Sequence, residues 1–279
     1  MIRTVNHLCC ALGIKKDVII QILSNIDSYY YEKELEKYKK NGQLKLNKEG
    51  TPRYRIINPS LNELKLIQDR INKFLSHNIL PTAYAYGATK GRDNVKNAKF
   101  HLGKKYVFQT DLQDFFPFVT SKATYEMFIR FGFSPDVSSK LTKLTTYKGH
   151  LPQGASTSAT IANLVFSKTG NKLALFCQEN NLYFSTFVDD VTISAPFDFK
   201  DRILEILAII VEGGFKISHQ KTTYKTNHPN ITGVKLGNNY LDVTDKFKMK
   251  LQSTEGKSEA QIKGEINYYN RVRDANKKK

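Results

Sequence analysis

The sequence predicts an α+β fold, in which helices are mixed with separated short strands. Apolar residues recur at helical spacing within residues 1–31 and again from Leu61 to Ile79. Residues 106–111 and 182–194 have strand patterns, and the second stretch predicts two strands around a tight turn at Asp189-Asp190. Because 40% of the 279 residues are hydrophobic, the chain can bury a sizeable core. This mixture of helices and separated strands is typical of the α+β class.

The first third of the chain contains several further predicted elements. Residues 32–50 are highly charged and predict an exposed helix end followed by a hairpin or loop. Residues 54–57 predict a short strand, and the next helix is expected to begin with a capping box formed by Ser60 and Glu63. A glycine-containing basic loop is expected at 83–92, followed by a helix over 93–102.

The rest of the chain alternates between helical and strand patterns. A long helix is expected to open in the small-residue run 155–162 and to end near residue 178. The last helix is expected to begin with a capping box formed by Ser258 and Gln261. This last helix is expected over 258–276. The other predicted elements are helices over 121–131, 135–146 and 199–212 and short strands within 215–243.

The charge of the chain points to a polyanionic partner. The formal net charge is +17 and the isoelectric point is near 9.6. Lysine and arginine gain free energy on phosphates by displacing condensed counterions, so this excess favours a nucleic acid. A membrane surface also attracts basic proteins, and a basic protein without such a partner is the remaining alternative.

The cysteines and the hydropathy pattern limit the cellular setting. Cys9, Cys10 and Cys177 are too few and too badly spaced for a disulfide framework or a zinc site. We expect no signal peptide, and no stretch approaches the roughly 20 apolar residues that span a bilayer. The sequence therefore predicts a protein of a reducing cytoplasm without a membrane partner.

Two acidic positions are candidates for metal binding. Asp111 ends an apolar strand, and Asp189-Asp190 lies at the tip of a hairpin with apolar or hydroxylic flanks. Carboxylates near a core are costly unless a cation neutralises them, and Mg²⁺ prefers such oxygen ligands together with substrate phosphates. Two Mg²⁺ ions held in this way would suit in-line nucleotidyl transfer. The alternative is that Asp-Asp only favours the turn.

Four segments, taken in order, carry a resemblance to a known family. They are Asp111-Leu112-Gln113-Asp114-Phe115-Phe116, Leu151-Pro152-Gln153-Gly154, Phe187-Val188-Asp189-Asp190, and the segment around Lys221. From about Arg53 onward the chain resembles the reverse transcriptases. The resemblance implies a right-hand polymerase with fingers, a palm whose antiparallel sheet is backed by helices, and a short helical thumb. The expected ranges are 1–105 and about 121–150 for the N-terminal helices and fingers, 106–243 mainly for the palm, and 244–279 for the thumb.

The same resemblance implies roles for individual residues in the palm. Asp111, Asp189 and Asp190 would be the metal ligands, with Phe187 standing where the family usually has Tyr. Phe116 would be an aromatic gate that clashes with a ribose 2′-OH and so favours dNTPs; the alternative is a core aromatic residue. Lys221 would donate a proton to the leaving pyrophosphate, unless it is only a solvated lysine.

Nucleotide-binding roles are implied for a second set of residues. Gln153 and Gly154 would lie beside the incoming nucleotide and template, where a glycine lets the backbone approach closely. An arginine of the first motif would grip the triphosphate in a bidentate manner, with Arg55 the first choice and Arg70 the second.

Further segments resemble the retron branch of the family. Asn97-Ala98-Lys99-Phe100-His101 is similar to the NAxxH element, Ile231-Thr232-Gly233 to the VTG element, and Gly264–Tyr269 to the start of the thumb. Asn97, His101, Thr232 and Gly233 would then bind RNA, as would the basic last helix. That helix carries Arg271, Arg273 and Lys277 to Lys279. The alternatives are a helix-end histidine satisfied within the fold and a solvated helix face.

The retron resemblance implies a specific reaction. Such an enzyme recognises the noncoding RNA of its operon (msr-msd) and copies part of it from dNTPs, beginning at the 2′-OH of a guanosine. The product is msDNA, a branched RNA–DNA molecule, and retrons act with an effector protein from the same operon in defence against phages. The chain stops soon after the first expected thumb helix, so we expect a small thumb or one completed by RNA or a partner.

Two alternative functions remain open at this point. The first is another bacterial reverse transcriptase, of the group II intron, diversity-generating or abortive-infection type, although no maturase or endonuclease region follows the palm. The second is a catalytically inactive RNA-binding scaffold, against which the intact Asp111, Asp189 and Asp190 argue.

Overall fold

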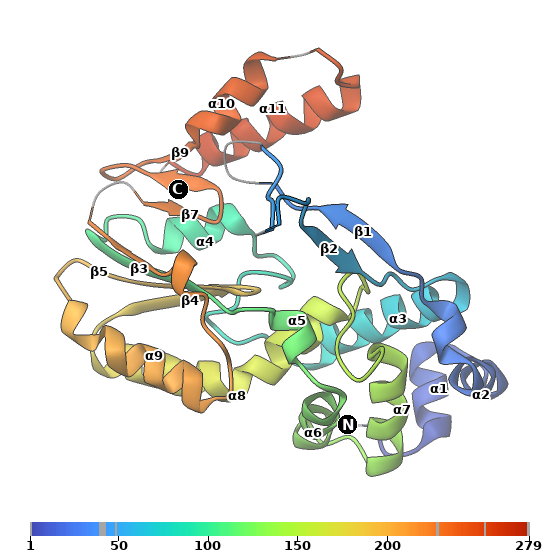
Figure 1. The fold of residues 1–279 in the computed structure, drawn as a ribbon. Coiled ribbons are helices and arrows are strands. Elements are labelled where there is room, and N and C mark those ends of the chain that lie inside the picture. The colour runs from blue at the N-terminus through green and yellow to red at the C-terminus, as the bar shows by residue number, and fades with distance from the viewer. Residues whose placement is uncertain (1, 39–42, 48, 227–228, 254, 278–279) are drawn as a thin grey trace. The chain divides into compact units, whose positions relative to one another are not determined.

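The computed structural model describes residues 2–38, 43–47, 49–226, 229–253 and 255–277 (Figure 1). The chain forms two compact units, each built from two segments of the sequence. Unit 1 comprises Met1–Leu80 and Asp114–Val165, and unit 2 comprises Pro81–Gln113 and Phe166–Lys279. Unit 2 thus contains most of the range expected for the palm and the whole range expected for the thumb. The finger, palm and thumb boundaries stay predictions.

Unit 1 is mainly helical. The apolar stripe of α3 is buried through Leu64, Ile67, Ile71 and Leu75, and it packs on α1 and α7. Its elements are α1 (Val5–Leu12), α2 (Lys16–Ser24), η1 (Ile26–Tyr29), β1 (Lys33–Glu36), β2 (Tyr54–Ile57), α3 (Asn62–Asn78), α5 (Phe115–Phe118), α6 (Ser121–Arg130), α7 (Pro135–Thr145) and the start of α8 (Ser158–Glu179). The predicted helices at 1–31, 121–131 and 135–146 are confirmed.

Two local predictions in unit 1 are wrong. The Ser60 hydroxyl donates to Gln68 Oε1 at 2.7 Å, deep in the core, so it is not free to cap the helix. Helix α3 instead begins after Leu61 without a side-chain cap. Among the described residues of 32–50 there is no helix end, because Lys33–Glu36 pair with Tyr54–Ile57 as an antiparallel ribbon.

Unit 2 is built on a four-stranded antiparallel sheet with the strand order β4-β5-β3-β6. The strands are β3 (Tyr106–Asp111), β4 (Tyr183–Phe187), β5 (Asp190–Ala195) and β6 (Thr223–Lys225). In Figure 1, α9 (Ile203–Glu212) and the adjoining part of α8 lie below this sheet, and α4 (Asn94–Phe100) lies above it. The predicted strands, the two-strand turn and the long helix are confirmed.

A second core lies between α4, β3 and a small three-stranded sheet. It contains nine buried residues: Val95, Ala98, Val107, Ile231, Val234, Leu236, Leu241, Val243 and Val272. The sheet is formed by β7 (Asn230–Ile231), β8 (Val234–Leu236) and β9 (Leu241–Val243). The other elements of unit 2 are η2 (Lys200–Arg202), η3 (His219–Lys221), α10 (Asp245–Gln252) and α11 (Glu259–Asp274). The capping box of Ser258 and Gln261 is confirmed at the start of α11. Among the described residues, no helix is long and apolar enough to span a membrane.

Candidate active site

Asp111 and Asp190 face each other across the two central strands of unit 2. They are direct partners in the antiparallel register of β3 and β5. Residues in such a pair share one face of the sheet, with Cβ atoms about 5 Å apart. Asp111 is only 7% exposed and Asp190 is half-buried. The fold therefore brings together two carboxylates that are far apart in the sequence.

A tight turn places Asp189 beside this pair. Phe187 pairs with Asp190, so Val188 and Asp189 form the whole loop between β4 and β5. Val188 has a φ of 59°, a left-handed conformation that is strained for a β-branched residue. The Leu112 N–H donates to the Asp189 carbonyl oxygen at 2.8 Å, which ties the turn to the end of β3.

A loop before α4 supports this turn, a role that the sequence did not reveal. The Thr186 N–H donates to the Tyr84 carbonyl and the Tyr86 N–H to the Thr186 carbonyl, each at 2.8 Å. A Cβ on Gly87 would lie 2.6 Å from the Val188 nitrogen, so only glycine allows this approach. Arg92 holds the loop by donating to three of its backbone carbonyls.

The clustering of carboxylates changes the acidity of Asp190. Burial, followed by the charges of Asp189 and Asp111, raises the pKa of Asp190 from 3.8 to about 6, although Lys221 opposes this shift. The ionised group is therefore less stable in the folded protein than in the unfolded chain. Since this carboxyl binds its proton more tightly when folded, stability falls as pH rises from about 4 to about 6 and stays lower above that range.

We expect Asp190→Asn to stabilise the protein when divalent metal is removed with a chelator. At pH 7.5 the gain should be about 1–3 kcal/mol, because the change removes a partly buried charge that is repelled by two neighbours. The gain should fade as the pH is lowered towards 4, where the wild-type carboxyl is protonated. Thermal denaturation at several pH values measures it, and an unchanged or lower melting temperature at pH 7.5 would contradict the expectation.

Lys221 provides a positive charge beside the carboxylates. Its Nζ donates to Asp111 Oδ2 at 2.5 Å. The segment before it is attached to the end of β3, since the Ser218 N–H donates to the Asp111 carbonyl and the Gln113 N–H to the Lys216 carbonyl, both at 2.9 Å. The Lys221 side chain is 61% exposed, so this ion pair is open to solvent and can separate at little cost.

The chemistry of these side chains fits a hard divalent cation. Three carboxylates at one end of a sheet supply the oxygen ligands that Mg²⁺ prefers. In the described part of the chain, no three His, Cys, Asp or Glu side chains already surround a common point as a metal site would require. Lys221 occupies one oxygen of Asp111, so a metal bound at that oxygen would compete with this ion pair.

The residues predicted to contact the nucleotide lie in unit 1. The Gln153 carbonyl accepts from the Asn58 N–H at 2.7 Å. Gly154 has a φ of 105°, and a Cβ there would lie 3.3 Å from the Pro59 ring. The predicted loop at 151–154 therefore packs on the chain that leaves β2, the strand on which Arg55 is exposed.

Arg70 and Phe116 have different surroundings in unit 1. The Arg70 guanidinium donates to the carbonyls of Leu12 and Gly13, at 2.9 and 2.5 Å, and so satisfies the end of α1. This placement favours a structural role for Arg70 and leaves Arg55 as the better candidate for the triphosphate. Phe116 is half-buried on α5, with its ring centroid 5.9 Å from that of Phe115.

The two elements that resemble the retron signatures meet in space. Asn94 Nδ2 donates to the Thr232 carbonyl at 3.0 Å, and the Thr232 hydroxyl donates to the Asn94 carbonyl at 3.3 Å. Asn97 Nδ2 lies 3.4 Å from the same hydroxyl. The turn that presents Thr232 has positive φ values at Thr232 and at the exposed Gly233. The elements thus join α4 to the β7–β8 turn.

His101 is buried within unit 2. Its ring nitrogens are hydrogen-bonded to the hydroxyls of Ser194 and Ser185, both at 2.7 Å, on the two strands that lead to the aspartate turn. Burial, with a smaller effect of Lys104, lowers the pKa of His101 to about 3, so the ring is neutral. Asn97 and His101 are 1% and 0% exposed, which does not fit direct RNA contact. A histidine satisfied within the fold matches this placement.

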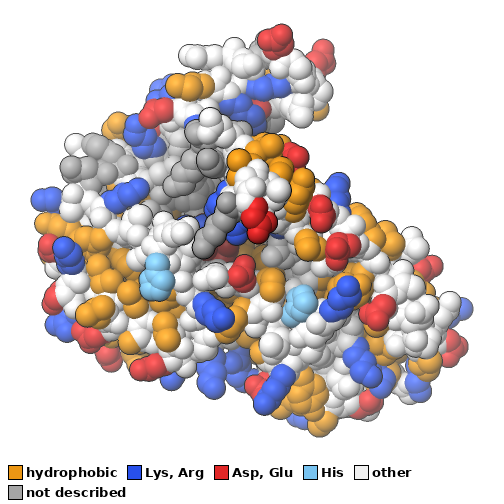
Figure 2. Space-filling model, viewed as in Figure 1, with side chains coloured by type: hydrophobic (Ala, Val, Ile, Leu, Met, Phe, Trp, Pro, Cys, Tyr) orange, Lys and Arg blue, Asp and Glu red, His pale blue; other side chains and the backbone are white. Residues whose placement is uncertain are grey.

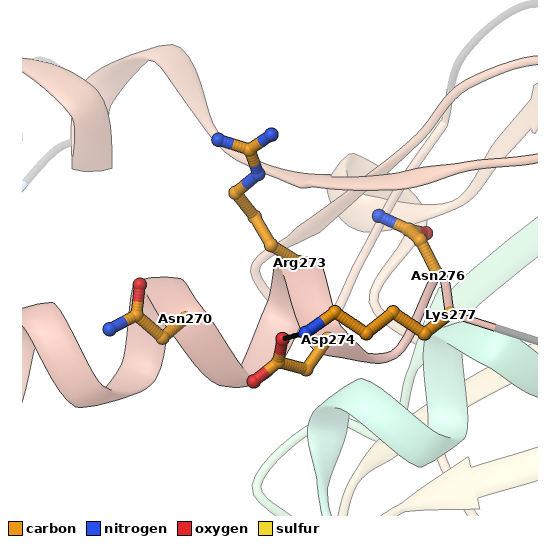
Figure 3. Close-up of a pocket in the computed structure, with 5 residues that line it drawn as sticks. All are labelled: Asn270, Arg273, Asp274, Asn276 and Lys277. Carbon is orange, nitrogen blue, oxygen red and sulfur yellow. Dashed lines mark ion pairs between the residues drawn. The ribbon is translucent and has the colours of Figure 1, made fainter.

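The basic residues of α11 are partly engaged with neighbours. Arg271 lies over the Tyr268 ring and 3.7 Å from Asp93 Oδ2, and Arg273 lies over the Tyr269 ring. A pocket of about 560 Å³ lies at the end of this helix. Lys277 pairs with Asp274 at 2.7 Å beside it, as the dashed line in Figure 3 marks. The pocket is lined by Asn270, Arg273, Asp274, Asn276 and Lys277. Lys278 and Lys279, for which RNA contact was predicted, lie outside the described residues. Lysine and arginine side chains are spread over the face in Figure 2 without forming one patch.

Known proteins resemble this chain in sequence. The family model for reverse transcriptase (RNA-dependent DNA polymerase) matches residues 39–245. The retron Se72 reverse transcriptase of Salmonella heidelberg (strain 579083-10) is 30% identical over 230 residues, which cover 80% of this chain and 57% of that protein. The retron Ec86 reverse transcriptase of Escherichia coli is 31% identical over 173 residues, covering 61% of this chain and 54% of that protein. The chain spans about half the length of these relatives.

A solved structure supports the fold. The apo telomerase from Candida Tropicalis superposes with a TM-score of 0.52 at 12% identity, over 92% of this chain and 56% of that one. This likeness, together with the antiparallel sheets and helices, confirms the predicted α+β, right-hand polymerase fold. The named relatives also confirm the resemblance to retron-type enzymes of bacteria. The chain therefore belongs to the reverse transcriptase family.

Proposed function

We propose that this protein is an RNA-directed DNA polymerase. The observation that carries the proposal is the pairing of Asp111 with Asp190 across β3 and β5, with Asp189 in the adjoining turn. These carboxylates would hold two Mg²⁺ ions. When bound, the ions would activate the attacking hydroxyl and neutralise charge on the leaving pyrophosphate.

The remaining chemistry would fall to other side chains. Lys221 would leave Asp111 when metal binds, and its ammonium group would then be available to donate a proton to the pyrophosphate. Arg55, Gln153 and Gly154 would contact the dNTP, and Phe116 would exclude a 2′-OH. These roles rest on the resemblance of their motifs.

The polymerase proposal is tested with purified protein, Mg²⁺, an RNA template and a DNA primer. We expect extension of the primer with dNTPs, and no extension in the presence of a chelator. A wild-type protein that binds the template but never extends the primer would overturn the proposal and leave the RNA-binding scaffold as the function.

We further propose that the natural template is a retron noncoding RNA in the bacterial cytoplasm. The protein would begin synthesis at a guanosine 2′-OH, produce msDNA, and act with an effector protein in defence against phages. The similarity to retron enzymes and the contact between the two retron-like elements support this proposal. Sequencing of the nucleic acid that co-purifies with the protein should reveal a covalent RNA–DNA branch. Unbranched products alone would favour another type of bacterial reverse transcriptase.

Gly87→Ala should lower DNA synthesis about 10-fold, because the added Cβ would displace the turn that carries Asp189. Primer-extension rates at saturating dNTP measure the effect. Gly264→Ala is the matched control, since a Cβ there would meet nothing within 4 Å. Full activity of the Gly87 variant would show that the close approach of the two loops is not needed for catalysis.

A further inference from the structure

Three aromatic rings form a continuous strip on unit 2, which we call the aromatic strip (Tyr86, Phe100 and Tyr183). The centroid of the Phe100 ring lies 5.9 Å from that of Tyr86 and 5.6 Å from that of Tyr183. Phe100 and Tyr183 are each 38% exposed, and Tyr86 is half-buried. A joined group of exposed rings marks an interaction site more strongly than isolated apolar residues do.

Basic side chains border the aromatic strip. Lys104 Nζ lies 3.9 Å from the centroid of the Tyr183 ring, and the Arg92 guanidinium lies 5.4 Å from that of Tyr86. Proteins bind single-stranded nucleic acids with aromatic rings interleaved with cations, because bases stack on the rings and phosphates lie near the charges.

Buried residues hold the central ring in place. Phe100 lies next to His101, whose ring is 5.1 Å away and nearly perpendicular to it. His101 is fixed by its two serine partners, and Asn97 is fixed on the same helix by Thr232. The inward members of the NAxxH-like element therefore fix the backbone from which Phe100 points outward. A rigid stacking surface loses little entropy when a base binds.

From these contacts we propose that the aromatic strip binds unpaired bases of a single-stranded nucleic acid, with a base stacked on Phe100 and a neighbouring phosphate at Lys104. The proposal rests on the proposed function, under which the strand is part of the RNA partner or newly copied DNA. The net charge of +17 and the bordering cations favour a polyanion over a protein partner.

The test is a fluorescence titration of the full chain with a labelled oligouridine of about 12 nucleotides, without dNTPs. Phe100→Ala should weaken binding about 5- to 100-fold, while affinity for an RNA duplex of the same length should change less than about twofold. Phe197→Ala is the control, because Phe197 is 45% exposed in the same unit and lies outside the strip. The matching oligodeoxyuridine shows whether the strip prefers RNA or DNA.

A second measurement does not depend on the folding of a variant. Ultraviolet crosslinking of wild-type protein to an oligonucleotide containing 4-thiouridine, followed by peptide mass spectrometry, should place the label on the strip. The proposal is overturned if Phe100→Ala binds with wild-type affinity, if Phe197→Ala loses affinity equally, or if the crosslinks are confined to other segments. Protein docking would then remain as the use of this surface. Failure of the polymerase proposal is recognised separately, because it appears as absent primer extension by the wild-type protein.

Discussion

Asp111→Asn and Asp189→Asn should each reduce RNA-templated DNA synthesis by at least ~10³-fold, because loss of a metal-binding carboxylate removes several kcal/mol of charge stabilisation from the transition state. The fold should survive both changes. Asp111 lies at the end of β3, and Asp189 is half-buried in a two-residue turn. Single-turnover primer extension with saturating Mg²⁺ and dNTP measures the loss.

The matched control for this prediction is Asp201→Asn. Asp201 lies in the same unit, on η2, and its side chain is 74% exposed in a surface ion pair with Arg202. Its replacement should leave synthesis within about twofold of wild type, since exposed ion pairs contribute little. Comparable activity of Asp111→Asn and wild type would remove the basis for assigning these carboxylates to catalysis.

Phe116→Ala should weaken the preference for dNTPs over NTPs roughly 10- to 100-fold, measured as the ratio of the two kcat/KM values. The physical reason is steric: a ring placed under the sugar would overlap with a 2′-OH, and an overlap of that kind costs about 1–3 kcal/mol. The effect should come from faster NTP incorporation more than from slower dNTP incorporation.

Phe118→Ala, on the same short helix, separates this role from simple loss of packing. Both variants remove a half-buried ring from α5. We expect selectivity to fall only in Phe116→Ala. If both variants lose stability and neither changes selectivity, Phe116 is a core aromatic residue.

The elements with strong periodicity were predictable from the sequence. The strand that ends at Asp111 and the two-strand turn at Asp189-Asp190 have the predicted positions, because alternation of side chains and local turn chemistry determine them. The register that pairs Asp111 with Asp190 is a tertiary property. The sequence could suggest that the aspartates belong together only through the order of the motifs.

Residue type alone does not reveal which partner a polar side chain takes in the fold. Ser60 is a residue type that often caps helices, but its hydroxyl donates to the buried Gln68. His101 was predicted to contact RNA, whereas both of its ring nitrogens are hydrogen-bonded to serines on two strands. The role of Gly87 was missed because it lies against the Val188 backbone, which only the fold brings near. The role of Arg92 was missed because its residue type does not show that it donates to carbonyls of its own loop.

The contact between Asn94, Asn97 and Thr232 has a consequence for protein engineering. Two short sequence elements separated by most of unit 2 form one hydrogen-bonded joint, so neither is a self-contained module. A chimera that takes residues 94–101 from a relative should fold and function well only when it also takes residues 230–233 from the same relative.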